Sequence, residues 1–340
     1  MSNLANNTVT MEEILALVQS LPEGGGASFP NGTEWTQSNI TNGKAESFCC
    51  ANGVWVAAGD ILRYSNDGKT WLPCTATSLS SEGYFEEFAA VGYANGCWVA
   101  TSSAESIWYS ENGIEWTPAD GTDGWYFNKL GFGNGIWIAS ADHEIFTSSD
   151  GKAWTLSYEF SNNVNSILYA SNIFVVGLVR GTYYSQDGVN WTNAATLGTA
   201  RANDLDYGSG LFVAATTTGL HYSVDGKTWT QSNITSTKAT VRHANGKWVA
   251  GGNGGAVFSQ DGKTWTQSNV TGVFNDIDHA NGVWVAGSAN LGLWYSFDGE
   301  VWTQSNITGN MRHIHNANGV WVAGSGGSAG MVYSVGWEPS

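Results

Sequence analysis

Short runs of apolar residues recur along this chain, and turn-forming pairs separate each run from the next. In residues 274–305 the runs are Phe274 to Ala280, Val283 to Gly287, Leu293 to Ser296 and Val301 to Ser305. Asn-Gly between the first two runs can supply the positive φ angles of a type I′ hairpin. Asp-Gly between the last two does similar work, because the Asp carboxylate can accept hydrogen bonds from turn amides. The pattern predicts a unit of four short antiparallel strands.

This unit occurs eight times. Its first turn ends in a bulky aromatic residue, at Trp55, Trp98, Trp137, Phe174, Phe212, Trp248, Trp284 and Trp321. Its second turn follows S-x-D-G-x-x-W and ends at Trp71, Trp154, Trp191, Trp229, Trp265 and Trp302, with an Asn112 variant at Trp116 and a weaker copy at Trp35. The copies are 36 to 45 residues apart, a spacing typical of propeller blades. A flat sandwich does not explain eight equal units, so the sequence predicts an all-β, eight-bladed β-propeller.

The two ends of the chain predict how the ring closes. A lone fourth strand, Thr33 to Asn39, begins the repeats, and three strands, Met311 to Ser334, end them. The segment from Trp35 to Thr41 recurs unchanged in two other fourth strands, residues 229–235 and 302–308. We therefore expect the first strand to join the last three and complete the eighth blade, which removes the open edges of the ring. The alternative is that Trp337, a remnant of the turn motif, belongs to a separate closing strand.

The S-x-D-G-x-x-W pattern resembles the Asp-box, or BNR-type, repeat of sialidases and related propellers, although the usual box is one residue longer. The resemblance covers residues 28–340 and implies the propeller fold. It implies no activity, because the box of that family is a structural turn remote from any active site. Sialidase chemistry also needs three converging arginines. The five in this chain lie in different blades and at different strand heights: Arg63, Arg180, Arg201, Arg242 and Arg312.

Residues 1–26 do not repeat, so we divide the chain into this segment and a propeller of residues 27–340. Thr10 and Glu13 form a capping box, and five apolar residues then fall on one helical face: Met11, Ile14, Leu15, Val18 and Leu21. A Gly-rich hinge follows. The predicted helix can dock on the ring, on a second copy or on another partner. This opening resembles tail-associated proteins of bacteriophages of gut Firmicutes, which implies a virion or self-association partner that binds through Met11–Leu21.

Composition limits the partners. The chain has 13 Lys and Arg against 29 Asp and Glu, a net charge of −16, so no basic stripe is present to bind nucleic acid. No apolar run is long enough for membrane insertion, and the N-terminus lacks the pattern of a secretory signal, so we expect synthesis in a cytoplasm, with any later exit as part of a particle. The four cysteines lack metal-site spacing, and His313 and His315 have no evident third ligand. We therefore expect neither a cofactor nor a metal.

The resemblance to known propellers implies that ligands bind mainly on the face formed by the connections between blades and between the second and third strands of each blade. Two of the connections between blades are long or rich in candidate residues. Residues 72–87 contain Tyr84, and residues 117–127 contain Asp123, Trp125 and Tyr126. Aromatic rings stack on the apolar faces of sugars and carboxylates accept hydrogen bonds from hydroxyls, so these four are candidate ligand-binding residues. The alternative is that residues such as Tyr126 begin the next inner strand and belong to the core.

A column of amides supplies the other candidate ligand-binding residues. Four blades open their first strand with an asparagine: Asn128, Asn165, Asn203 and Asn275. The same slot holds Glu46 in the first blade and Arg312 in the last. Innermost strands line the central channel of a propeller, so these amides can ring a ligand or ion at the channel mouth. Alternatively, they can bridge neighbouring blades or ordered water.

These features favour a non-enzymatic recognition module that binds a bacterial surface glycan or receptor from a phage or phage-like particle. Two alternatives stay open. A propeller-type glycoside hydrolase or sialidase-like enzyme needs two carboxylates in one pocket, and the candidates are Glu86, Glu87, Asp120 and Asp123. A protein-binding structural scaffold predicts a binding face that lacks an aromatic pocket.

Overall fold

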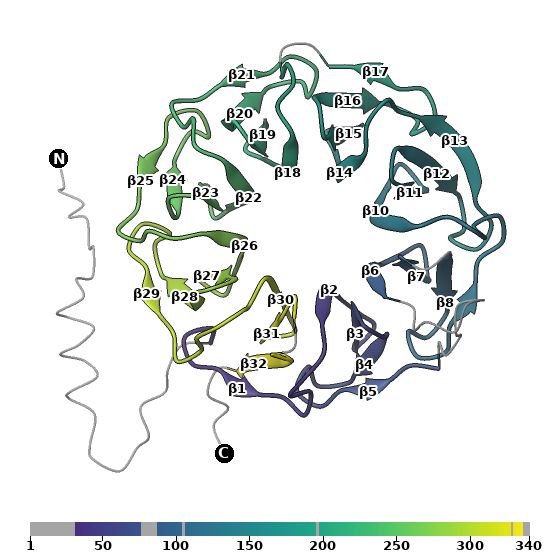
Figure 1. Cartoon of the computed structure of the whole chain (residues 1–340), viewed down its shortest axis with the longest axis horizontal. Helices are drawn as coiled ribbons and strands as arrows, with labels where there is room; N and C mark the ends of the chain where they lie inside the picture. The colour runs from purple at the N-terminus through teal and green to yellow at the C-terminus, as the bar shows by residue number, and fades with distance from the viewer. Residues whose placement is uncertain (1–30, 76–86, 104–105, 195–196, 328, 336–340) are drawn as a thin grey trace, which may run out of the picture.

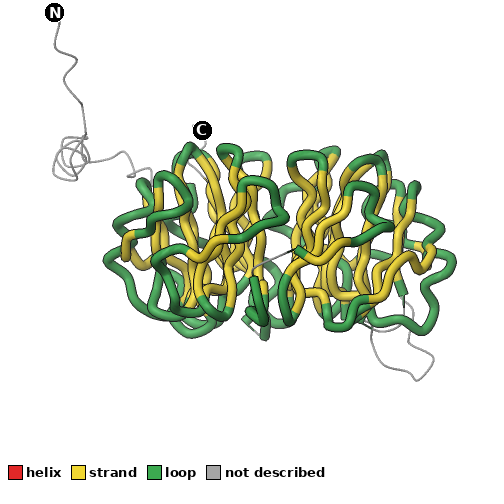
Figure 2. The backbone as a smooth tube through the Cα atoms, turned by 90° about the horizontal axis from the view of Figure 1, so that it is seen from above, coloured by secondary structure: helices red, strands yellow, loops and turns green. Residues whose placement is uncertain are grey.

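The computed structural model describes residues 31–75, 87–103, 106–194, 197–327 and 329–335. These residues form a ring of eight four-stranded antiparallel sheets (Figure 1), with a central channel lined by side chains of the inner strands. Seen from the side, the strands run between the two faces of a flat disc and the loops gather at both faces (Figure 2). The prediction of an all-β, eight-bladed propeller is confirmed. Within these ranges no helix has the length and apolarity that crossing a membrane requires.

Each blade uses four strands in chain order from the channel outward, and the eighth blade combines both ends of the chain. Blades 1 to 4 contain β2 Ala45–Ala51, β3 Val54–Gly59, β4 Arg63–Ser65, β5 Leu72–Pro73; β6 Phe88–Ala94, β7 Cys97–Ser102, β8 Ile107–Ser110, β9 Thr117–Pro118; β10 Phe127–Gly133, β11 Ile136–Ala141, β12 Glu144–Ser148, β13 Thr155–Glu159; and β14 Val164–Ala170, β15 Ile173–Leu178, β16 Thr182–Ser185, β17 Thr192–Asn193. Blades 5 to 8 contain β18 Ala202–Gly208, β19 Leu211–Thr216, β20 Gly219–Ser223, β21 Thr230–Gln231; β22 Lys238–Ala244, β23 Lys247–Gly252, β24 Val257–Ser259, β25 Thr266–Gln267; β26 Phe274–Ala280, β27 Val283–Ser288, β28 Gly292–Ser296, β29 Thr303–Gln304; and β30 His313–Ala317, β31 Val320–Gly324, β32 Met331–Val335, β1 Thr36–Gln37.

The hairpin between the first two strands of each blade has the conformation that its sequence predicts. Asn52 and Gly53 have φ angles of 52° and 79°, and the equivalent pair in every other blade also has two positive φ angles. These are the signs of a type I′ turn, whose twist matches that of the flanking strands. The fourth blade meets the same requirement without glycine, because Ser171 and Asn172 both adopt positive φ there.

The Asp-Gly turns between the third and fourth strands share one set of hydrogen bonds. Ser65 Oγ donates to Asp67 Oδ1 (2.8 Å) and accepts from the amide of Gly68 (2.9 Å). Asp67 Oδ1 also accepts from the amides of Lys69 and Thr70, at 2.8 Å each. The same bonds recur at Asn112, Asp150, Asp187, Asp225, Asp261 and Asp298. A side-chain oxygen at this position therefore replaces backbone partners that the tight turn lacks.

The ring closes as the two ends of the sequence predict. Thr36 and Gln37 of β1 pair antiparallel with β32, and Gly32 donates its amide hydrogen to Ser334 Oγ (2.9 Å). Asn31 bonds the carbonyl of Gly319, which lies in the hairpin turn of the same blade. The first strand therefore starts on the face that carries the Asn-Gly and Asp-Gly turns, which we call the turn face. The predicted helix of residues 1–26 and Trp337 lie outside the described residues.

Asparagine side chains just after the outer strands join four of the eight pairs of neighbouring blades. Asn306 Oδ1 accepts from the amide of Trp35 (2.9 Å), while its Nδ2 donates to the carbonyl of the same residue (2.8 Å). Three other asparagines make the same two bonds to the next blade: Asn39 to Trp71, Asn233 to Trp265, and Asn269 to Trp302. We call this arrangement the asparagine latch. All four near-identical segments contain this asparagine.

Each of the first seven inner strands has a one-residue bulge near its start. In β10 the pairing shifts between Phe127 and Lys129, so Asn128 is the extra residue, and the equivalent shift occurs at Glu46, Ala89, Asn165, Asn203, Ala239 and Asn275. A bulge breaks the strict alternation of side chains. The bulged residue and the one after it both line the channel. They lie at the end of the ring opposite the turn face, which we call the mouth face because the inter-blade connections enter there.

Candidate functional site

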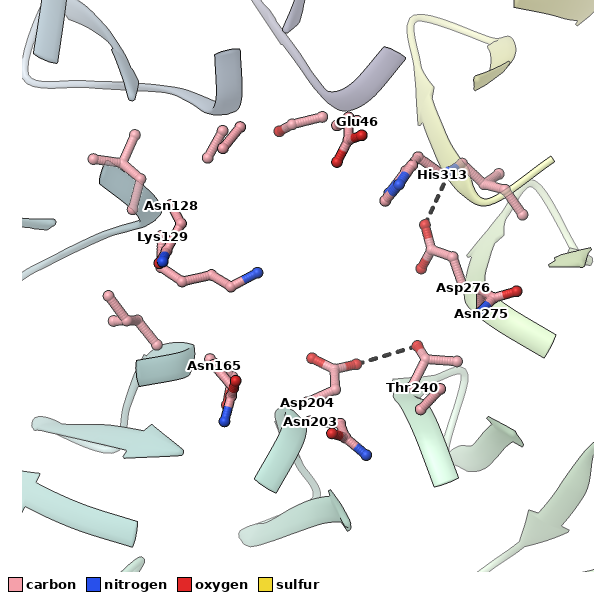
Figure 3. Close-up of a pocket in the computed structure, with 18 of the residues that line it drawn as sticks. Glu46, Asn128, Lys129, Asn165, Asn203, Asp204, Thr240, Asn275, Asp276 and His313 are labelled. Carbon is pink, nitrogen blue, oxygen red and sulfur yellow. Dashed lines mark hydrogen bonds between the residues drawn. The ribbon is translucent and has the colours of Figure 1, made fainter. Parts of the chain in front are cut away.

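The central channel contains a cavity of about 430 Å³, and all eight inner strands contribute to its lining (Figure 3). Most of the lining residues belong to the first half of each strand, next to the mouth face. The titratable side chains among them are Glu46, Lys129, Asp204, Arg242, Asp276, His313 and His315. They are unevenly distributed, because blades 2 and 4 contribute none and blades 5 to 8 contribute five.

One side of the cavity, which we call the acidic wall, consists of Arg242 between Asp204 and Asp276. Arg242 Nη1 donates to Asp204 Oδ2 at 3.1 Å, and Arg242 Nη2 lies 3.8 Å from Asp276 Oδ1. Asp206 and Asp278 lie two residues further along the same two inner strands. One cation thus stands among four carboxyl groups, and attraction by Asp204 in particular raises the pKa of Arg242.

The carboxylates of the acidic wall also hold neighbouring blades together. Asp204 Oδ2 accepts from the amide of Val241 (3.0 Å), and Asp276 Oδ2 accepts from the amide of Ile314 (2.9 Å). Burial raises the pKa of Asp276 to about 7, although Arg242 and the amide of Ile314 favour the ionised form. Asp276 therefore titrates near neutral pH, whereas a carboxyl in water does so near pH 4.

A different environment surrounds Lys129, whose ammonium extends from β10 into the cavity (Figure 3). Lys129 forms no ion pair within 4 Å among the described residues. Burial lowers the pKa of Lys129, Asp204 and Glu46 oppose this shift, and Arg201 adds to it. Arg201 Nη2 donates to Asn165 Oδ1 at 2.9 Å. We call Lys129, Asn165 and Arg201 the cationic corner.

His313 and His315 face the cavity from β30. Burial, together with the nearby charges of Lys129 and Arg312, lowers the pKa of His313 to about 4, so this imidazole is neutral at pH 7. His315 also has a lowered pKa because of burial, and its ring packs edge-on against Trp55 at 5.8 Å. Across the described ranges, no group of three or more His, Cys, Asp and Glu side chains is placed to hold a metal ion.

The four predicted asparagines all line the cavity, where each forms one side-chain hydrogen bond to the framework. Asn203 Nδ2 donates to the carbonyl of Lys238 in the next blade (2.8 Å), and Asn165 accepts from Arg201. Asn128 Oδ1 accepts from Ser140 Oγ (3.0 Å) within its own blade. Asn275 Oδ1 likewise accepts from the amide of Ala289 (3.1 Å). The geometry thus places the amides together and gives each a structural bond.

Of the aromatic candidates, neither Trp125 nor Tyr126 lines this cavity. Tyr84 lies outside the described residues. Trp125 is half-buried and packs against Phe146, with ring centroids 5.3 Å apart. Tyr126 is 54% exposed and Asp123 is also exposed, so Tyr126 is not part of the core. The connection before β10 therefore presents one exposed ring beside one carboxylate, close in sequence to Asn128.

The acidic residues considered for a hydrolase have other surroundings. Glu86 lies outside the described residues, and Glu87 pairs with Lys44 at 2.7 Å. The amide of Asp120 donates to the carbonyl of Lys152 in the next blade (2.9 Å), so its backbone joins two blades. Neither Glu87, Asp120 nor Asp123 lines the channel cavity, and Arg242 is the single arginine among the described residues that line it.

Sequence reasoning missed Lys129, Asp204, Arg242 and Asp276. Three of these directly follow a predicted asparagine, so the bulge that turns two successive residues into the channel hid them from a search for alternation. The sequence did contain an indication of these residues. The position directly after the asparagine position of each blade is polar in seven of the eight blades: Ser47, Lys129, Ser166, Asp204, Thr240, Asp276 and His313.

No protein-family model and no curated protein matches this sequence. Solved structures with the same shape do match. Sqt1 from Saccharomyces cerevisiae has a TM-score of 0.69 at 8% identity, covering 92% of this chain and 100% of that chain. BamB from Moraxella catarrhalis has a TM-score of 0.68 at 11% identity, covering 88% and 99%. A structure described as YCF48 bound to D1 peptide has a TM-score of 0.62 at 13% identity, covering 91% and 99%. At these identities the likeness concerns the fold alone, and it supports an eight-bladed β-propeller.

Proposed function

We propose that this protein is a non-enzymatic scaffold that binds another protein by taking a short segment of it into the mouth of the central channel. The channel cavity carries the proposal, because eight blades fix a set of polar and charged groups around it. Its volume of about 430 Å³ lies in the usual range of small-ligand pockets. It therefore admits a few side chains of an extended segment and excludes a folded domain.

The lining lacks the surface on which sugar recognition usually depends. No Tyr or Trp is among the described residues that line the cavity, and Phe48, the one phenyl ring there, is 9% exposed. Sugars stack on exposed aromatic faces. Fixed amides and charges instead suit the backbone and the charged side chains of a peptide. The chemistry of the cavity therefore favours a protein partner over a neutral glycan.

Likeness in fold gives independent support. A propeller of similar shape, YCF48, is described as bound to D1 peptide. At 13% identity nothing about that peptide carries over to this chain. The likeness supports only the narrower idea that a ring of this shape is a suitable peptide-binding framework.

Selection from a random linear peptide library against the full chain, followed by calorimetry, tests this proposal. Ala90→Trp adds an indole to the cavity lining, so it should weaken binding of the selected peptides at least tenfold. Thr230→Trp is the matched control, because Thr230 is exposed on the outer strand β21 and lines none of the hollows described below. The proposal fails if the library yields no binder, or if the two tryptophan variants bind the selected peptides equally well.

Glycan binding is a second candidate, and two hollows on outer strands favour it. One lies beside Tyr184 in the fourth blade and the other beside Phe258 in the sixth, with volumes of about 310 and 260 Å³. Each combines an aromatic ring with the Gln-Asp pair of an Asp-Gly turn. A lysine lies over each ring: Lys227 is 5.1 Å from the centroid of Tyr184, and Lys247 is 5.6 Å from that of Phe258.

A glycan array separates the two candidates. Binding that is lost in Phe258→Ala and retained in Ala90→Trp would support the outer hollows and a glycan partner. The described acidic residues considered for the enzyme alternative, Glu87, Asp120 and Asp123, do not line the channel. Of the carboxyl groups that do, Asp204 and Asp276 bind amides of the next blade and lie beside Arg242. Display on a phage or phage-like particle, recognition of a bacterial surface and attachment through Met11–Leu21 are proposals that rest on the sequence.

A further inference from the structure

The lining of the channel cavity contains more carboxyl groups than cations. Three carboxyl groups face the cavity from blades 1, 5 and 7: Glu46, Asp204 and Asp276 (Figure 3). Two cations face it, Lys129 and Arg242, whereas Arg201 of the cationic corner is not part of the described lining. His313 and His315 add no charge at pH 7, because burial lowers the pKa of each. The cavity is therefore acidic, in a chain whose net charge is already −16.

More carboxyl groups stand directly behind the acidic wall. Asp206 and Asp278 lie close enough to Arg242 to raise its pKa, together with Asp204 and Asp276. The charge of Arg242 is thus shared among four carboxyl groups of its own wall. Protonation of Asp276 alone does not remove the excess, because four other carboxyl groups then remain against two cations. The wall therefore creates a negative potential in the cavity, and a cation from solution is attracted to it.

Glu46 is the carboxyl group of the lining with the least compensation. As the extra residue of the bulge in β2 it faces the channel. Among the described residues its side chain forms neither an ion pair within 4 Å nor a hydrogen bond. Asp204 Oδ2, in contrast, accepts from Thr240, Val241 and Arg242. Figure 3 shows Glu46 and Asp276 on either side of His313, so a cation placed there would be attracted by both without breaking a framework bond.

A second, independent feature indicates that the cavity takes a polar occupant. Ser166 is 8% exposed and lines the cavity, and its Oγ has no hydrogen-bond partner among the described residues. The same holds for Nδ2 of the neighbouring Asn165. Buried polar atoms in proteins nearly always have a partner. An extended segment offers one to each, since its backbone carries both amide donors and carbonyl acceptors.

We propose that the cavity binds one basic side chain of the partner segment, a lysine or an arginine, with its cation between Glu46 and Asp276. This inference rests on the proposed peptide-binding function and names the group that the channel recognises. Hydrogen bonds between a cation and a carboxylate are stronger than neutral ones, and the cavity is a partly buried setting for them. Lys129, which extends from blade 3, donates to a backbone carbonyl of the segment and repels a second cation.

Calorimetric titration of the full chain with short peptides at low salt tests this inference. The probes are blocked pentapeptides that differ only at the central residue, which is lysine, arginine, glutamine or glutamate. Measurement at pH 8 keeps Asp276 ionised, since its pKa is about 7. We expect one or both basic peptides to bind at least fivefold more tightly than the glutamine peptide, and the glutamate peptide to bind most weakly. Spermidine is the fifth probe. If it binds more tightly than every peptide, the cavity takes a free polyamine and the peptide version is overturned.

Variants of the lining locate the bound cation. Glu46→Gln should at least halve the preference for a basic over a glutamine peptide, and Glu46→Lys should abolish it. Lys129→Met removes the opposing cation and should increase the preference. Glu115→Gln is the matched control, because Glu115 is exposed on the turn between β8 and β9 and should leave the preference unchanged.

Equal binding of basic and glutamine peptides to the wild-type chain, or equal effects of Glu46→Gln and Glu115→Gln, would overturn the inference. The proposed function can survive that result. If library peptides bind and Ala90→Trp blocks them while the basic probes bind no better than the glutamine probe, only this inference fails. If neither the library peptides nor the probes bind, the proposed function fails with it.

Discussion

At the scale of single residues, backbone carbonyl groups stabilise a buried charged side chain. Lys238 is 1% exposed, and its ammonium donates to the carbonyls of Asn253 and Gly255 at 3.1 Å each. Equivalent positions in other blades hold Phe88, Phe127 and Phe274, so a lysine here replaces a core side chain. Burial lowers the pKa of Lys238 to about 8.

This lowered pKa predicts how stability depends on pH. Between about pH 8 and 10.5 the unfolded chain binds a proton at Lys238 that the folded chain has released, so this lysine contributes a rise of the free energy of unfolding with pH. Its contribution is bounded by about 3 kcal/mol. Burial raises the pKa of Cys49 to about 11 and that of Cys74 to about 12, so these thiols contribute a fall in the same window. The free energy of unfolding of Lys238→Met should therefore rise less, or fall more, with pH than that of the wild-type chain. Urea unfolding at pH 7.5, 8.5 and 9.5 measures this difference in slope.

The control for the pH experiment is Lys263→Met, because Lys263 lies over the aromatic ring of Tyr222 on the outside of the propeller. Its pH slope should match that of the wild-type chain. Parallel slopes for all three proteins would show that Lys238 does not titrate in this range. The two carbonyls left without a donor in Lys238→Met lower its stability at every pH, so the slope and not the absolute value is diagnostic.

At the scale of elements, the outer strands contribute more to the contacts between blades than to strand pairing within a blade. Most of them pair over only two residues, such as Thr303–Gln304 in β29. The asparagine latch follows directly after these short strands and reaches the backbone of the next blade. A latch with two hydrogen bonds compensates for a strand that makes few of its own.

Asn306→Ala should therefore loosen the joint between the seventh and eighth blades. It removes the partners of both the amide and the carbonyl of Trp35, at a cost of about 2 kcal/mol. For a chain of this size that cost lowers Tm by roughly 2–5 °C. Asn306→Asp keeps the acceptor and loses the donor, so its Tm should lie between that of the wild-type chain and that of Asn306→Ala.

The matched control is Asn193→Ala, which changes an exposed outer-strand asparagine in β17. Its Tm should stay within about 1 °C of the wild-type value, because surface substitutions usually have small effects. Differential scanning calorimetry compares the four proteins. If Asn306→Ala and Asn193→Ala have the same Tm, the asparagine latch contributes nothing to stability.

For the whole molecule, one strand decides whether the ring is closed. β1 supplies the outer edge of the eighth blade, and Trp35 just before it is 4% exposed in the core between blades 7 and 8. Trp35 also receives the latch of Asn306. Removal of this segment leaves a three-stranded blade with an unpaired edge at β32.

A chain that starts at Ser28 should have a Tm close to that of the full-length protein. For a chain that starts at Lys44, the free energy of unfolding should fall by roughly 5 kcal/mol or more, which is the cost of deleting a buried tryptophan with its hydrogen bonds. Thermal melts of the three chains measure the difference. Equal melting of the Ser28 and Lys44 chains would show that closure is dispensable. Light scattering of the full-length and Ser28 chains then tests self-association through Met11–Leu21.

Local pattern was sufficient for the fold. Turn chemistry at pairs such as Asn52-Gly53 requires positive φ, a requirement that belongs to adjacent residues, and the repeat of eight such turns predicts the blades. Closure was also predictable, because Trp35 to Thr41 repeats a fourth strand and therefore has only one open place in a ring. The asparagine column correctly indicated which residues face the channel.

The chemistry of that channel was decided only by tertiary structure. Lys129, Asp204 and Asp276 follow the bulged residues, and a bulge changes the side-chain alternation on which strand patterns depend. Arg242 meets Asp204 and Asp276 because blades 5, 6 and 7 are neighbours, although 38 residues separate Arg242 from Asp204. Sequence alone thus determined a closed ring of eight equal blades, since each blade is built from short-range rules. Which charges oppose each other across the channel depends on distances between blades, and those exist only once the ring has closed.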